Sequence, residues 1–251
     1  MMANTQAQLL SQFPYPRRRW IRSVLRQLTR LALATLSDFR LIGAENLPSA
    51  GPLIVVANHF HFADPVAVVR STPWPMEFLA GFQLPNAPAV VEWIPKVWGS
   101  YLVRRGAASR TAIRASMAVL EQKGVLGIFP EGGSWAQVLR PARPGAAYLA
   151  AQTGVPLLPM GLDGLVDLFP QLLKGKRATV TVRIGKPFGP FYAEGRGRAH
   201  RQQLDEIGHQ MMQHISELIP PERRGIYSSD PAVREAAQEA AVYPYHDLDA
   251  A

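Results

Sequence analysis

Blocks of apolar and polar positions follow one another along this chain in an order that predicts strands separated by helices. Apolar or β-rich runs, typical of buried strands, occupy residues 52–58, 125–129, 155–162 and 178–185. Helical periodicity or small-residue helical composition marks residues 110–122, 145–154 and 204–219. This order predicts an α/β fold, a single domain with a mixed, largely parallel central sheet flanked by helices.

The N-terminal segment has a different pattern, that of a basic amphipathic helix. Between residues 18 and 32, apolar side chains fall on one arc of a helix and arginines on the other. Such a helix either lies in the headgroup layer of a membrane or packs its apolar arc on the domain and leaves the arginines solvated. If it binds a membrane, the expected contact residues are Trp20, Ile21, Val24, Leu28, Arg22, Arg26 and Arg30.

Composition and charge narrow the class of protein. The 251 residues are 47% hydrophobic and 18% charged, which is typical of a globular chain. The absence of cysteine excludes disulfides, thiolate nucleophiles and cysteine zinc sites. The net charge is +8 and residues 1–37 contain no acidic residue, so the partner is either a nucleic acid or an anionic membrane. Phosphate-backbone binding needs no apolar face, so we expect no nucleic acid.

We expect three segments: the basic N-terminal helical segment 1–40, a catalytic domain over 41–220, and a polar, loosely attached C-terminal tail over 221–251. No run approaches the about 18 apolar residues that a transmembrane helix needs, and the N-terminus lacks the layout of a cleaved signal. Any membrane contact is therefore expected to be peripheral.

Candidate chemistry lies directly after the first apolar run, in the sequence NHFHFADP at residues 58–65. The Asp64–Pro65 pair predicts a helix start with Asp64 as N-cap, and the turn before it can bring the carboxylate to the His59 ring. Such a pair can remove a proton from a hydroxyl. Alternatively, Asp64 only caps the helix and His59 only satisfies the backbone. His61 is a second candidate base or a substrate contact.

Three further segments follow in order: GSYLVRR at 99–105, FPEGGS at 129–134 and VPLLPMGL at 155–162. Together with NHFHFADP they resemble the four ordered blocks of the glycerolipid acyltransferase family, which contains the bacterial 1-acyl-sn-glycerol-3-phosphate acyltransferases. The resemblance covers about residues 40–190, and LIPPERRGIY at 218–227 is similar to the ending of some bacterial members.

The resemblance implies that His59 is the general base and Asp64 its partner. It implies that Arg105, which closes the second block, helps to hold the phosphate of the acceptor. Guanidinium groups and backbone N–H groups suit a phosphate monoester. A solvated Arg105 is the alternative.

The third and fourth blocks imply further contacts. Glu131 and Gly132 match positions tied to the acceptor site, and Gly132 with Gly133 permits close approach of the backbone. Pro156 and Pro159 match a strand that lines the site and is linked to acyl-donor binding. A plain turn and a buried strand, respectively, are the alternatives.

The sequence departs from the family pattern at three places. His61 stands where serine is usual, and Gly133 and Ser134 stand where threonine and arginine are usual. The lost arginine removes an expected phosphate contact, for which Arg104 is a candidate replacement. These departures leave the acceptor headgroup open.

The resemblance implies transfer of a fatty acyl chain from acyl-CoA or acyl carrier protein, as co-substrate, to the hydroxyl of a lysophospholipid. The expected acceptor is 1-acylglycerol-3-phosphate, with a different lipid acceptor as the alternative. We expect no bound cofactor, no metal, and a location on the cytoplasmic side of the cell membrane. The rivals are a serine hydrolase that uses Ser134 in GGSWA and a non-catalytic membrane or nucleic-acid binder that uses the arginine-rich helix.

Overall fold

The computed structural model describes residues 2–81, 91, 93–103 and 110–242. The strands are β1 (Ser37–Ile42), β2 (Leu53–Ala57), β3 (Met76–Gly81), β4 (Tyr101–Val103), β5 (Val125–Ile128), β6 (Leu157–Asp163) and β7 (Ala178–Ile184). The helices are α1 (Met2–Gln12), α2 (Arg19–Leu36), α3 (Asp64–Ser71), α4 (Ile94–Trp98), α5 (Arg110–Glu121), α6 (Pro144–Thr153), α7 (Leu168–Leu173), α8 (Gly197–Ser216), α9 (Pro231–Ala236) and α10 (Gln238–Ala241).

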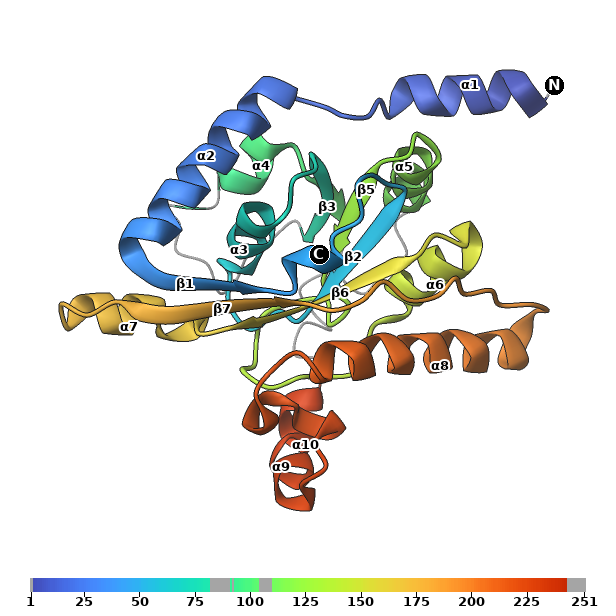
Figure 1. The fold of residues 1–251 in the computed structure, drawn as a ribbon. Coiled ribbons are helices and arrows are strands. Elements are labelled where there is room, and N and C mark those ends of the chain that lie inside the picture. Colours follow the sequence, from blue (N-terminus) through green and yellow to red (C-terminus); the bar gives the residue numbers. More distant parts are fainter. Residues whose placement is uncertain (1, 82–90, 92, 104–109, 243–251) are drawn as a thin grey trace.

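The strands of the described residues form one seven-stranded sheet in the order β1-β7-β6-β2-β5-β3-β4. Every pair is parallel except β6 with β7. The predicted mixed, largely parallel sheet flanked by helices is therefore confirmed. Figure 1 shows α2, α3 and α4 on one side of the sheet and α8 on the other.

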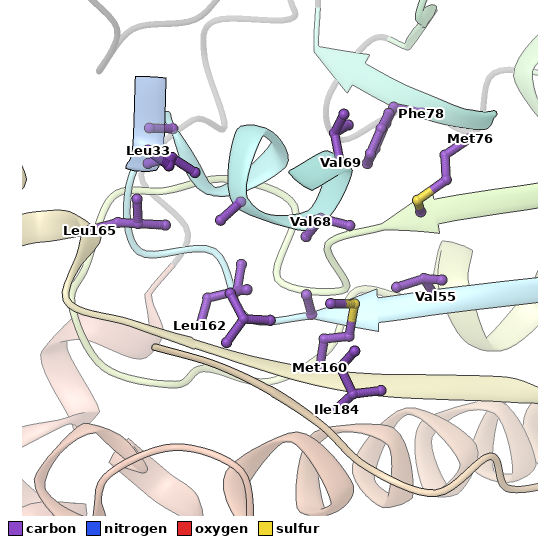
Figure 2. Close-up of a cluster of buried hydrophobic side chains, with 14 of the residues drawn as sticks. Leu33, Val55, Val68, Val69, Met76, Phe78, Met160, Leu162, Leu165 and Ile184 are labelled. Carbon is purple, nitrogen blue, oxygen red and sulfur yellow. The ribbon is translucent and has the colours of Figure 1, made fainter. Parts of the chain in front are cut away.

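Helices on both faces explain why β2 is apolar at every position. Alternate side chains of a strand point to opposite faces, and all five residues of β2 are buried. Val55 packs with α3 and with Met160 of β6, in the cluster shown in Figure 2. Ile54 and Val56 pack into the second cluster, with residues of α6 and α8.

The α2 helix docks on the domain partly through its arginines, which its pattern did not indicate. Arg22 is 1% exposed and makes a two-pronged ion pair with Glu77 of β3, at 2.6 and 2.7 Å, while its Nε donates to the Trp98 carbonyl. Arg26 donates to the carbonyls of Pro73 and Trp74. The expectation that Arg22 contacts a membrane is therefore wrong, because a buried carboxylate and free carbonyls draw it inward.

The apolar arc of α2 consequently faces outward. Trp20 is 79% exposed and Leu31 is 63% exposed, and the same side carries Ile21, Val24 and Leu28, which are also exposed. Arg30 is exposed as well. Of the two alternatives for this helix, packing of the whole apolar arc on the domain is excluded.

Residues 221–242 are folded rather than loosely attached, so that expectation is wrong for them. They form short helical turns followed by α9 and α10. The backbone N–H of Leu139 donates to the Arg223 carbonyl, and the Trp135 indole donates to the Ala240 carbonyl. Gly225 has φ +53°, and a side chain there would meet the Leu139 carbonyl oxygen at 2.1 Å. This segment therefore holds the loop that follows β5.

In the part of the chain that the structure describes, no helix is long and apolar enough to cross a bilayer.

Candidate active site

The carboxyl ends of β2 and β5 bring the first and third sequence blocks together. These strands are parallel neighbours in the register Val56↔Ile128, so continuation of the register sets His59 opposite Glu131. Asn58 closes the end of β2 against β6, because its amide donates to the Leu162 carbonyl at 2.9 Å and accepts from the Leu162 N–H at 2.7 Å.

His59 and Asp64 form the predicted pair. The distance from His59 Nδ1 to Asp64 Oδ2 is 2.9 Å. The same carboxylate oxygen accepts from the backbone N–H groups of Phe60 and His61, at 2.7 and 2.8 Å. Asp64 is 1% exposed, so these donors are what compensates its burial.

Asp64 is not the N-cap that the sequence predicted. The helix α3 begins at Asp64 itself, and its N-cap is Ala63, without a side-chain cap bond. The carboxylate instead reaches back over the preceding turn to the N–H groups there. The consequence is favourable for chemistry, because the carboxylate then fixes the His59 ring rather than a helix terminus.

The contacts of His59 leave one ring nitrogen available. With Asp64 accepting from Nδ1–H, the neutral ring has its unprotonated lone pair at Nε2. The ring stacks on Phe129 at 4.3 Å between centroids and 25° between planes, which fixes its orientation. Its side chain is 16% exposed, so it reaches the surface of a mostly enclosed site.

Glu131 holds the backbone of His59, and Arg140 holds Glu131. The Glu131 carboxylate accepts from the His59 N–H at 2.6 Å and from Arg140 Nε at 2.7 Å. Arg140 Nη2 then donates to the carbonyls of His59 and Gly133, at 3.0 and 2.7 Å. Glu131 is fully buried, which raises the pKa of its carboxyl, and the Arg140 guanidinium acts in the opposite direction.

These contacts make Glu131 a positioning residue rather than a group that faces a substrate. Gly132 has φ +82°, in the left-handed region that favours glycine. A side chain at Gly132 would meet Arg143 Cγ at 3.1 Å. Gly132 and Gly133 form a tight turn between β5 and Arg140.

His61 lies beside the pair, within an aromatic cluster. Its ring centroid is 4.2 Å from that of Phe62 and 5.9 Å from that of Phe169, which belongs to α7. Burial lowers the pKa of His61, and the nearby Asp64 carboxylate opposes this effect.

The structure does not bring Pro156 to this site. Ile54 N–H donates to the Pro156 carbonyl, which places Pro156 at the amino end of β6. His59 lies beyond the opposite, carboxyl end of the neighbouring strand β2. At about 3.3 Å per residue the two are roughly 20 Å apart along the strand direction. Pro159 is paired with Val56 inside the sheet and is buried, whereas Pro156 is exposed just before β6. A role of either proline in acyl-donor binding stays a prediction.

Arg104 and Arg105 lie outside the described residues. Within the described part of the chain, no group of three or more histidine, aspartate or glutamate side chains is arranged to hold a metal ion.

The sequence patterns missed three residues of this site. Asn58 lay within the quoted motif and could have been identified as the residue that ends a buried strand. Phe129 could have been identified from its place at the end of β5. Arg140 lies outside the quoted blocks; its ion pair with Glu131 spans nine positions, but its contact with the His59 carbonyl spans 81.

Comparisons with known proteins show the family of this chain. The profile of the family named Acyltransferase matches residues 38–163, half of the chain, and the chain belongs to this family. A chloroplast 1-acyl-sn-glycerol-3-phosphate acyltransferase of Brassica napus is 30% identical over 151 residues, 58% of this chain. A 1-acyl-sn-glycerol-3-phosphate acyltransferase of Borreliella burgdorferi is 28% identical over 132 residues, 51% of this chain. The matches span only 43% and 52% of those two relatives.

The fold is also similar to a solved structure. The crystal structure of the 1-acyl-sn-glycerophosphate (LPA) acyltransferase PlsC from Thermotoga maritima superposes with a TM-score of 0.55 and 25% sequence identity. The superposition covers 81% of this chain and 85% of that one. The resemblance to the acyltransferase family drawn from the four blocks is therefore confirmed.

Proposed function

We propose that this protein transfers a fatty acyl chain from a thioester to the free hydroxyl of a lysophospholipid, with 1-acylglycerol-3-phosphate as acceptor and phosphatidic acid as product. Membership of the acyltransferase family and the names of the relatives support the reaction class and the acceptor. The single observation that carries the mechanism is the 2.9 Å contact between His59 and a buried Asp64 at the carboxyl end of β2.

In the proposed mechanism, His59 Nε2 takes the proton of the acceptor hydroxyl as its oxygen attacks the thioester carbonyl. Asp64 stabilises the imidazolium that forms, since its carboxylate accepts from Nδ1–H. The tetrahedral intermediate then collapses, the carbon–sulfur bond breaks, and the proton on His59 passes to the thiolate that leaves. No acyl-enzyme forms, which agrees with a chain that contains no cysteine.

The thioester donor in this proposal is acyl-CoA or acyl carrier protein. The acceptor phosphate is held by cationic and N–H groups, among which Arg105 is proposed by its match to the second block. Arg104 is proposed to supply the phosphate contact that is lost where Ser134 stands in place of the arginine usual in the third block.

We also propose that the protein binds the cytoplasmic surface of the cell membrane through α2. The outward Trp20, Leu28 and Leu31 side chains, together with the exposed Arg30, support this contact. An apolar helix face of this kind is suited to the boundary between headgroups and acyl chains, and basic residues to anionic lipid.

The test is acyl transfer by purified protein to 1-oleoylglycerol-3-phosphate in vesicles, with oleoyl-CoA and with oleoyl acyl carrier protein supplied separately. We expect phosphatidic acid from the unaltered protein and a loss of about 10²- to 10⁴-fold in kcat for His59→Ala. The matched control is His209→Ala, at an exposed histidine of α8, which is expected to retain activity.

Full activity in the His59→Ala variant would refute the mechanism. Loss of activity in Ser134→Ala, with release of free fatty acid by the unaltered protein, would instead favour the hydrolase. Transfer to other lysophospholipids but not to 1-oleoylglycerol-3-phosphate would overturn the acceptor while it upholds the reaction class.

A further inference from the structure

The α7 helix carries an apolar surface outside the catalytic site and outside α2. Leu173 is 90% exposed, the highest value among the large apolar side chains of the described residues, and Phe169 is 45% exposed. Residues four apart lie on the same side of a helix, so Phe169 and Leu173 form one outward ridge.

This ridge is not the result of a helix that lacks an inner face. Leu168 is buried in the main apolar cluster, and Leu172 packs against the same cluster. The helix is thus anchored by two leucines while it presents two other apolar side chains to the outside. Burial of a leucine side chain is favourable by about 1.5–3 kcal/mol, so a partner that covers the exposed Leu173 would gain binding free energy.

The ridge begins at the proposed catalytic site. The Phe169 ring stacks on Phe62 at 5.8 Å and lies 5.9 Å from the His61 ring. His61 is two residues from the proposed base, His59. A partner surface that binds α7 would therefore also lie next to the proposed catalytic site.

Cations follow the ridge immediately. Lys174 and Lys176 are exposed directly after Leu173. Arg177 donates to the carbonyls of Ala34 and Ser37, which ties this segment to the carboxyl end of α2. Figure 1 shows α7 and the carboxyl end of α2 at the same end of the sheet.

We propose that α7 is a second lipid-contact element, in which Phe169 and Leu173 enter the headgroup layer of an anionic bilayer and Lys174 and Lys176 bind its phosphates. An apolar tip flanked by lysines matches the chemistry of that layer. With α2, it gives two points of attachment that turn the site mouth toward the lipid. The inference rests on the proposed function for the contact of α2 and adds α7 to it.

Anionic lipid is favoured over a protein partner by size and charge. A stable interface between proteins buries roughly 800 Å² on each side, whereas this ridge consists of two side chains. Arg177 joins the segment after the ridge to the carboxyl end of α2, where Leu36 is also exposed.

The first experiment uses the absence of cysteine from the chain. A Leu173→Cys variant can be labelled at a single thiol with a dye whose emission shifts to shorter wavelength in an apolar environment. Tyr192→Cys is the matched control, because Tyr192 is also strongly exposed but lies beside Gly154 at the end of α6. Each labelled protein is mixed with vesicles of phosphatidylcholine alone, or of phosphatidylcholine and phosphatidylglycerol in equal parts.

We expect a shift for the dye at residue 173 with the anionic vesicles, and no shift for the dye at residue 192. No substrate is present, so the result does not depend on acyl transfer. Co-sedimentation with the vesicles without a shift at residue 173 would overturn the role of α7 and leave α2 as the contact. Failure to co-sediment at all would overturn both. An equal shift without vesicles that depends on protein concentration would show that a second copy of the chain covers the ridge.

A second experiment measures affinity. Leu173→Asp is expected to weaken partition into anionic vesicles about tenfold or more, and neutralisation of Lys174 and Lys176 by glutamine about fivefold each. Tyr192→Asp is expected to leave partition unchanged. Transfer to a water-soluble, short-chain acceptor should survive Leu173→Asp. Loss of this transfer in Leu173→Asp, with vesicle binding intact, would assign α7 to the catalytic site instead.

Discussion

Replacement of Arg22 by methionine tests most directly whether the Arg22 side of α2 faces the domain. Arg22 is 1% exposed and Glu77 is fully buried, and the two are joined by two contacts of 2.6 and 2.7 Å. Methionine keeps much of the apolar stem but removes the charge and the bond to the Trp98 carbonyl. The change therefore leaves a buried carboxylate with one fewer cation.

Removal of one partner from a buried ion pair costs about 3–5 kcal/mol of folding free energy. Arg17 also contacts Glu77, at 2.6 Å, but its side chain is 25% exposed, so we expect a loss near the lower limit, about 3 kcal/mol. For a chain of this length about 1 kcal/mol shifts the melting temperature by about 2–4 °C, which gives a decrease of about 6–12 °C.

Thermal unfolding followed by circular dichroism measures this decrease. The matched control is Arg30→Met on the same helix, where an exposed arginine is removed and the expected change is within about 0.5 kcal/mol. The double variant Arg22→Met, Glu77→Met should be more stable than Arg22→Met alone, because the buried carboxylate is then removed together with its buried cation. Arg17, which loses Glu77 in the double variant, is partly exposed and keeps the Gly99 carbonyl.

Equal melting temperatures for Arg22→Met and Arg30→Met would refute the reasoning. They would mean that Arg22 is solvated and that the apolar arc of α2 lies against the domain, which is the other alternative that the sequence pattern left open. The outward surface on which the membrane proposal rests would then not exist.

Three other changes test the site. Asp64→Asn removes the carboxylate from Nδ1 of His59, so kcat should fall about 10²- to 10⁴-fold with melting temperature less affected than activity; an unchanged kcat would contradict the dyad. Arg140→Met leaves Glu131 without its cation and frees the His59 carbonyl, so steady-state kinetics should show a kcat lower by about 10²-fold; stability lost without kcat would make Arg140 merely structural. Burial lowers the pKa of His61 in the folded protein, so the unfolded chain binds its proton first and stability should fall as pH drops below about 6.5. Denaturant unfolding at several pH values should show this fall reduced in His61→Gln, and an unreduced fall would exclude His61 as its source.

The sequence predicted the sheet and the central pair for a local reason. A strand that is covered on both faces must be apolar at successive positions, and β2, β5 and β6 consist of such apolar runs. His59 and Asp64 are only five positions apart, so a tight turn followed by a helix brings them together. The exact role of Asp64 in the helix start was mistaken, because the carboxylate could satisfy N–H groups before the helix as well as within it.

Longer separations were beyond any local pattern. Glu131 meets the His59 backbone across 72 positions, and Arg22 meets Glu77 across 55. Neither pairing follows from spacing, since the sheet order β6-β2-β5-β3 sets which strand ends are neighbours. The contact of Arg140 with the His59 carbonyl, across 81 positions, depends on the sheet order in the same way.

The sequence by itself determined the four runs that form β2, β5, β6 and β7, which helix face of α2 is apolar, and which turn can hold a histidine beside an aspartate. It did not indicate β3 or α4. Only the tertiary structure decided that the apolar face of α2 is uncovered, that Arg22 is buried, and that α7 presents Leu173 outward. The physical reason is that hydrophobic periodicity records the polarity of a face but not what lies against it. A charged side chain is buried only where a partner compensates it, and for Arg22 that partner is Glu77, 55 positions away, which only the fold brings near.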